Sequence, residues 1–176
     1  VLLQNSNIDY DKQNALKQKY TVARYKVDLY HLFIEKGGKL LCNDGFLCYI
    51  TPSTFLTNIY TEKLRRFMLI DYAVNFIVNI EDSVFEACVN TCLVGMKKST
   101  TDLKSLTYSK GVLRPSFLTK IISVCPQIEY IKANACIIQP MENDKDSKVI
   151  SKIEQIGTPL SDYAVVRFGM QLRNRK

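Results

Sequence analysis

The sequence predicts an α/β fold in which helices flank a mixed sheet, and three observations lead to this prediction. Residues 28–52 combine a helix, a tight turn and an apolar strand in about the length of one helix–strand unit. Residues 72–80 alternate in the manner of a strand. Two further strands, residues 90–97 and 103–109, are separated by only a short polar segment, which predicts that they pair antiparallel.

The first helix carries an apolar stripe. Its expected members lie at offsets of 3, 4, 7 and 11 and are Leu29, Leu32, Phe33, the stem of Lys36, and Leu40. Gly37 and Gly38 each cost roughly 1 kcal/mol inside a helix, which predicts either close packing of a neighbour or a local kink. His31, the only histidine, has no nucleophile arranged around it, and we expect it to be structural.

The helix is expected to end at the turn 43–45, where Asn and Asp bond locally and Gly45 can take a positive φ. Residues 46–51 then form an apolar run without polar alternation, which is typical of an inner strand in a parallel sheet. Ser53 or Thr54 can cap the helix that follows. Its expected apolar face comprises Phe55, Leu56, Ile59, Tyr60, Leu64, Phe67 and Met68.

The later segments give weaker patterns. The partly polar second face of strand 72–80 predicts a position toward the edge of the sheet. Residues 111–140 leave their structure open, whereas the charged residues 142–148 precede an expected helix that Gly157 ends.

Composition excludes several classes of protein. The chain has 176 residues, of which 47% are apolar and 23% charged, as in ordinary globular proteins. No apolar run approaches the roughly 20 residues that cross a bilayer, so we expect an intracellular, cytoplasmic protein without membrane contact. The six cysteines form no CxxC pair, which predicts reduced, mostly buried thiols and no metal site. The absent initial methionine and the abrupt end at Lys176 suggest an excised piece of a longer polypeptide.

The net charge of +7 is distributed unevenly along the chain. Residues 12–27 contain no acid, and their cations are Lys12, Lys17, Lys19, Arg24 and Lys26. Residues 11–20 could form a short helix within what we expect to be a loop. A solvated surface and a site for an anionic partner both explain the cations at this point.

Four motifs give the chain a family resemblance. In order they are KVDLYHLFIEKGGKLL, GFLCYITPSTFL, LRRFML and SVFEACVNTCLVGMKK, spanning residues 26–98. Together they resemble the second half of the catalytic domain of amino-methylating adenine DNA methyltransferases of the gamma class, the TaqI type, including combined restriction-modification and PglX-like polypeptides. Residues 158–176, TPLSDYAVVRFGMQLRNRK, resemble the start of the target-recognition domain that follows in this family.

The resemblance implies a domain plan and a reaction. The expected fold is part of a Rossmann-like methyltransferase domain, with a parallel strand, a terminal antiparallel hairpin and flanking helices. Residues 1–27 would be a basic loop, 28–110 the C-terminal half of the domain, 111–157 a connection, and 158–176 the start of the recognition domain. In the longer parent, S-adenosylmethionine would give its methyl group to the adenine amino nitrogen in double-stranded DNA. The N-terminal cofactor half and the recognition domain would be the partners of this piece.

The resemblance also implies roles for single residues. Phe33 matches the aromatic that lies against the adenine ring of S-adenosylmethionine, although it could equally be the centre of the helix stripe. Phe85 matches the aromatic that stacks on the extruded target adenine, with a core position as the alternative. Asn90 and Thr91 would support that base pocket, and the cations of residues 12–26 would contact DNA phosphates.

The sequence departs from the family in two respects. It lacks the motif Asn-Pro-Pro-Tyr. Residues 7–10 have the outer Asn7 and Tyr10 of that motif but neither of its prolines. It also lacks the glycine-bearing turn and the acidic residue that hold the cofactor. No catalytic residue is therefore assigned, and we expect the fragment alone to be inactive. A non-catalytic DNA-binding or protein-interaction module, derived from half of a methyltransferase, is the alternative function.

Overall fold

The computed structural model describes residues 10–24, 28–81, 90–98, 105–112, 118–140, 149, 152–153 and 155–165. It divides into two compact units, residues 1–141 and 142–176. In the second unit, residues 152–153 and 155–156 are helical, and the amide of Gly157 donates to the Ile153 carbonyl at 2.7 Å. No helix among these described residues is long and apolar enough to cross a membrane.

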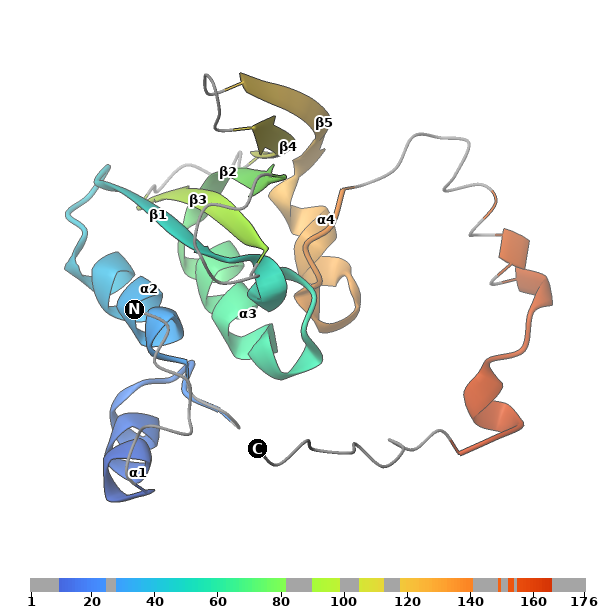
Figure 1. Ribbon diagram of the computed structural model, residues 1–176, viewed down its shortest axis with the longest axis horizontal. Helices are drawn as coiled ribbons and strands as arrows, with labels where there is room; N and C mark the ends of the chain where they lie inside the picture. Colours follow the sequence, from blue (N-terminus) through green and yellow to red (C-terminus); the bar gives the residue numbers. More distant parts are fainter. Residues whose placement is uncertain are drawn as a thin grey trace, which may run out of the picture. The chain divides into compact units, whose positions relative to one another are not determined.

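The first unit is built on a five-stranded mixed sheet (Figure 1). The strands, in the order of the chain, are β1 Phe46–Pro52, β2 Ala73–Ile80, β3 Thr91–Lys97, β4 Ser105–Val112 and β5 Leu118–Pro126. Their order across the sheet is β1-β3-β2-β4-β5. The pair β2–β4 is parallel, and the other three neighbouring pairs are antiparallel. The predicted α/β fold with a mixed sheet is confirmed.

Helices cover one face of this sheet. They are α2 Leu29–Leu40, α3 Glu62–Asp71 and α4 Gln127–Lys132, while α1 Tyr10–Lys19 precedes them. Figure 1 shows α2 and α3 below β1 and β3, with α4 beside α3. One core contains Ile34 of α2, Met68 of α3 and Tyr130 of α4, together with Ile77 and Met96 of the sheet. Burying these apolar side chains against the sheet is the main stabilising term of the unit.

The places of the strands differ from the sequence prediction. Strand β1 is antiparallel to β3 and lies at an edge of the sheet, not inside a parallel arrangement. Its Phe46 and Ile50 are 51% and 41% exposed, so the apolar run was a poor guide to burial on both faces. Strand β2, predicted toward an edge, lies at the centre between β3 and β4.

The predicted hairpin of residues 90–97 and 103–109 is also wrong. Strands β3 and β4 are separated by β2, which pairs with both of them. The antiparallel partner of β4 is β5, a strand within the segment whose sequence pattern was ambiguous. A short connection favours a hairpin, but it does not force one, and here β2 lies between the two strands and pairs with both.

Local chemistry around the predicted turns needs two corrections. The residue with positive φ after α2 is Asp44, at 60°, and not Gly45. The predicted helix after Pro52 begins later, because two 3₁₀ turns, Ser53–Leu56 and Ile59–Thr61, precede α3. Neither Ser53 nor Thr54 caps a helix, whereas Asn58 accepts the Tyr60 amide at 2.9 Å.

Helix α2 is confirmed, but its buried face is not the predicted stripe. Phe33 and Leu40 are 60% and 71% exposed, and the buried residues are His31, Leu32, Ile34, Glu35 and Gly38. A Cβ on Gly38 would lie 2.9 Å from the Tyr72 ring. The glycines therefore mark close packing, and this close approach turns the glycine-bearing side of the helix toward the sheet.

The cysteine prediction holds in part. Cys92 and Cys136 are buried and form no disulfide, whereas the free thiols of Cys42 and Cys48 are exposed. Cys88 lies outside the described residues. Among the residues that the structure describes, no group of three His, Cys, Asp or Glu side chains could hold a metal ion.

Candidate functional site

The candidate site lies at the edge of the sheet where β1, β2 and β4 end. These three strands run in the same direction, because β3 is antiparallel to both β1 and β2, and β4 is parallel to β2. The register pairs Thr91 with Pro52 on one side and with Ile80 on the other. We call this rim, made of residues 52–54, 80–81 and 90–91, the carboxyl edge. Ligands of α/β proteins bind at such an edge.

Asn90 and Thr91, predicted from the resemblance, meet at the carboxyl edge. The Asn90 carbonyl accepts the Ser53 amide at 2.9 Å and the Ser53 hydroxyl at 3.2 Å, which ties β3 to the end of β1. The Asn90 side chain is exposed. Thr91 is 1% exposed, and its hydroxyl has no hydrogen-bond partner in the described part of the chain. A buried hydroxyl without a partner is costly, and a role in binding is one explanation for it.

Helix α2 begins at the same edge. The Tyr30 ring packs edge-on against Phe55, directly after β1, with ring centroids 6.2 Å apart. Burial raises the pKa of the Tyr30 hydroxyl, and a hydrogen bond with Thr54 opposes that shift. Farther along the helix, a Cβ on Gly37 would contact Leu47 in the first half of β1. The helix therefore runs antiparallel to β1, with its first turns near the carboxyl edge.

Phe33 lies in this first half of α2 and is not a core residue. It is 60% exposed, although both of its neighbours in the chain, Leu32 and Ile34, are buried. An exposed aromatic ring on a helix that is otherwise packed offers a flat apolar surface to a ligand. The alternative, that Phe33 is the centre of a buried stripe, is wrong.

Phe85, the predicted base-stacking residue, lies outside the described residues. It belongs to the connection between Ile80, the last residue of β2, and Thr91, the first residue of β3. Both ends of that connection are at the carboxyl edge. Its stacking role stays a prediction.

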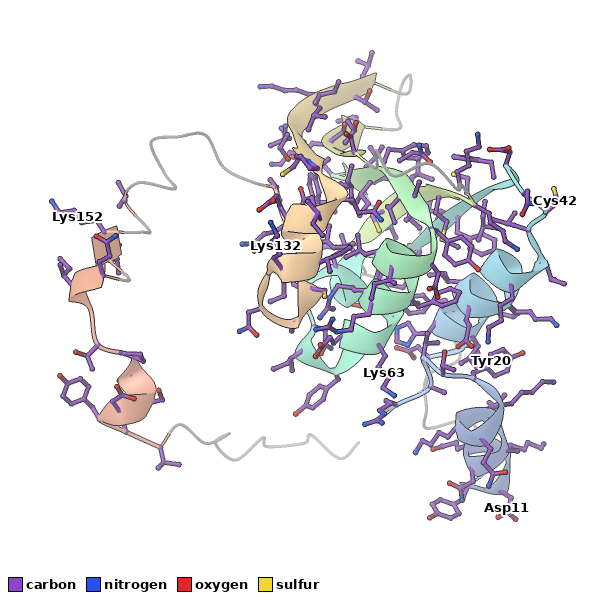
Figure 2. All side chains as sticks on the ribbon, turned by 180° about the vertical axis from the view of Figure 1, so that it is seen from behind. Asp11, Tyr20, Cys42, Lys63, Lys132 and Lys152 are labelled. Carbon is purple, nitrogen blue, oxygen red and sulfur yellow. The ribbon has the colours of Figure 1, made fainter. Side chains whose placement is uncertain are left out.

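Helix α1 confirms the short helix predicted at residues 11–20, within residues 12–27, which we call the basic segment. Residues 20–24 form neither helix nor strand, and the rest of the expected loop lies outside the described residues. Figure 2 labels Asp11 and Tyr20, near the two ends of α1. The cations Lys12, Lys17, Lys19 and Arg24 are exposed, and Lys26 lies outside the described residues. Helix α1 has no fully buried residue; its Leu16 packs against the core, as does Tyr20, the residue that follows the helix.

Two buried charged residues that support the site were not predicted. Glu35 of α2 is 0% exposed and accepts hydrogen bonds from Thr21, Val22 and Lys39. Burial alone would raise the pKa of Glu35, but these hydrogen bonds outweigh burial and lower it. The sequence does place Glu35 beside apolar residues of the same helix. However, Lys39 follows four residues later, and this spacing is typical of an ion pair on the surface of a helix.

Arg65 of α3, the second of these residues, is also 0% exposed. Its guanidinium donates to the carbonyls of Phe55, of Asn58 at 2.7 Å and of Ala135 at 2.8 Å. The first two carbonyls belong to the turns that follow β1, so Arg65 fixes the backbone just beyond the carboxyl edge. One guanidinium carries donors enough to satisfy several carbonyls at once.

His31 is buried beside Tyr30, which agrees with its predicted structural role. Burial lowers the pKa of His31 from 6.5 to about 4, so the neutral form is favoured in the folded state. The unfolded chain binds the proton more readily, so stability is complete above pH 6.5 and declines as the pH falls toward 4. The expected loss is about 3 kcal/mol, from this difference in pKa.

The measurement is urea unfolding at pH 7 and at pH 4, for the wild type and for His31→Phe. The aromatic replacement removes the titrating group, so the decline attributed to His31 should be absent from the variant. Glu35 contributes in both proteins and only below its ordinary pKa of 4.5, because its pKa is lowered. An identical pH dependence in the two proteins would contradict the assignment.

Comparisons with known proteins agree with this geometry. The family model described as Eco57I restriction-modification methylase matches residues 3–85. The chain is 29% identical over 147 residues to the type II restriction enzyme and methyltransferase RM.Eco57I of Escherichia coli. It is 30% identical over 135 residues to the type II methyltransferase M.BstVI of Geobacillus stearothermophilus. These alignments cover 80% and 75% of this chain but 14% and 23% of the relatives.

A solved structure supports the fold. It is a protein of Listeria monocytogenes assigned as a class I S-adenosylmethionine-dependent methyltransferase, with a TM-score of 0.50 and 17% identity. The match covers 62% of this chain and 34% of that chain. The sheet and helices of the first unit thus share the Rossmann-like methyltransferase fold. Residues 3–85 therefore match an Eco57I restriction-modification methylase domain.

Proposed function

We propose that the chain is the C-terminal half of the catalytic domain of an adenine-specific DNA methyltransferase. The observation that carries the proposal is the exposed ring of Phe33 in the first half of α2, within the segment that matches the methylase family. The names of both relatives, which contain the word methyltransferase, support it. The other half of the domain, with Asn-Pro-Pro-Tyr and the glycine-bearing turn, belongs to the rest of the longer protein.

S-adenosylmethionine fits this site as the cofactor. Phe33 offers an exposed aromatic plane that can stack on the adenine ring of the cofactor. When bound, the cofactor supplies an activated methyl group. The residues of this chain hold and orient the cofactor, because the hydrogen-bond acceptors for the amino group of the target adenine belong to the missing Asn-Pro-Pro-Tyr motif.

The target base would be held near Thr91 and Asn90. An adenine taken out of the duplex loses its stacking, and Phe85 in the adjoining connection would replace it. The exposed Asn90 side chain and the buried hydroxyl of Thr91 would shape the wall behind the base.

Double-stranded DNA would meet the basic segment. Its four described cations are exposed, and none of them forms a salt bridge within the described part of the chain. Neutralising phosphates with such cations releases counterions, so binding should weaken steeply as salt rises.

The test is methyl transfer to DNA from S-adenosylmethionine carrying a labelled methyl group. The longer protein is expected to label the amino group of adenine, and the 176-residue chain alone to label nothing. Methylation by the chain alone would contradict the assignment of the missing motifs. If the coding sequence upstream holds neither Asn-Pro-Pro-Tyr nor a glycine-rich turn, a non-catalytic DNA-binding or interaction module replaces the enzyme.

A further inference from the structure

Glu35 joins two parts of the site that are distant in the sequence. Its Oε1 accepts the Thr21 amide at 3.1 Å and the Thr21 hydroxyl at 3.0 Å, and its Oε2 accepts the Val22 amide at 2.9 Å. Lys39, one turn along α2, donates to the same Oε1. The carboxylate is thus fully satisfied although it is buried, which is the condition for a charge to be stable in a protein interior.

The segment that Glu35 holds is the end of the basic segment. Val22 and Ala23 are 5% and 6% exposed and belong to the core, whereas Arg24 and the cations of α1 are exposed. Helix α1 itself offers little attachment, because it has no fully buried residue. The hydrogen bonds to Glu35 are therefore the specific connection between the exposed cations and α2.

We propose that Glu35 is a positioning residue, which fixes the basic segment on the helix that carries Phe33 so that the cations face DNA in a defined register. Glu35 itself touches neither DNA nor cofactor in this proposal. The role rests on the proposed function, since it needs the basic segment to contact phosphates. Fixing the cations in advance lowers the conformational entropy lost on binding, which improves affinity.

The variant Glu35→Gln distinguishes this proposal from simple electrostatic attraction, because the two predict opposite changes in DNA binding. Glu35→Gln raises the net charge of the chain by one unit from +7, so simple attraction to DNA predicts tighter binding. Our proposal predicts the opposite. A glutamine side chain replaces one acceptor oxygen by an NH₂ donor, which must then face a donor of Thr21, Val22 or Lys39. The hydrogen bonds that connect the basic segment to α2, which we call the tether, are therefore broken. The matched control is Glu62→Gln, which makes the same change in charge at an exposed pair with Arg66.

The first measurement is the binding of a fluorescently labelled DNA duplex to the 176-residue chain at several salt concentrations. Glu35→Gln should weaken binding about tenfold and reduce the salt slope by about one unit for each cation displaced. Glu62→Gln should bind as tightly as the wild type or slightly more tightly. Equal or tighter binding by Glu35→Gln would overturn the proposal.

The second measurement follows the tether without DNA. Trypsin should cut after Lys19 or Arg24 about tenfold faster in Glu35→Gln than in Glu62→Gln, because the released segment opens locally. A second variant, Thr21→Val, removes one hydrogen bond, leaves the carboxylate in place and keeps the test available if Glu35→Gln fails to fold. Its rate of cleavage should lie between those of Glu62→Gln and Glu35→Gln. If Glu35→Gln and Thr21→Val are both cleaved at the wild-type rate, the tether is overturned. Absence of DNA binding by the wild type would instead contradict the proposed function.

Discussion

Replacement of Arg65 by Met is expected to lower the free energy of unfolding by about 3–4 kcal/mol, measured by urea denaturation. The variant keeps an apolar side chain of similar length but removes the guanidinium donors to the Phe55, Asn58 and Ala135 carbonyls, of which the first two keep Thr61 as a donor. In the described part of the chain, the Ala135 carbonyl has Arg65 as its only donor, and Ala135 is held at a φ of 50°. Loss of Arg65 leaves this carbonyl unsatisfied beside a backbone that is already strained.

The adjacent Arg66 is the matched control. It is 47% exposed and forms a surface ion pair with Glu62 at 2.7 Å. Exposed pairs of this kind contribute little, so Arg66→Met should leave the free energy of unfolding almost unchanged. Equal losses in the two variants would show that charge, and not the buried hydrogen bonds, explains the effect.

Replacement of Phe33 by Ala is expected to weaken the binding of S-adenosylmethionine to the complete methyltransferase roughly tenfold or more. Stacking of an aromatic side chain on a base contributes about 1–3 kcal/mol. The exposed ring contributes little to the core, so the melting temperature should barely change. Titration calorimetry of the cofactor, together with thermal unfolding, measures both quantities.

Leu40→Ala is the control for Phe33. It removes another exposed apolar side chain from α2, 71% exposed, at the end of the helix away from the carboxyl edge. Its cofactor affinity should equal that of the wild type. A variant Phe33→Ala that binds S-adenosylmethionine normally would remove Phe33 from the cofactor site.

Residues near one another in the sequence carried most of the correct predictions. The helix of α2 follows from its periodicity, and strands β1, β2 and β3 follow from apolar or alternating runs. Asn90 and Thr91 were identified through a motif; Thr91 pairs with Pro52 at the carboxyl edge, and the role of both residues in a base pocket stays a prediction. Close packing at Gly38 was one of two predicted readings, because a glycine in a helix requires a compensating reason.

Glu35 and Arg65 could not be predicted, because their partners lie far away in the chain. Glu35 bonds to Thr21, 14 residues earlier, and Arg65 bonds to Ala135, 70 residues later. A charged residue in a helix reads as a solvated surface residue unless its distant acceptors or donors are known. The strained turn around Ala135 supplies one of those acceptors. Because Ala135, and not a glycine, has the positive φ, the sequence does not indicate a turn of this kind.

The sequence by itself determined the fold class, most helices and strands, and the family motifs, because these depend on local periodicity and residue type. Only the tertiary structure decided that β1 is an edge strand, that β2 is central and that β4 pairs with β5. It alone decided that α2 buries Gly38 and exposes Phe33. The physical reason is that strand order and helix rotation depend on which distant surfaces pack together, and local patterns leave several such packings open.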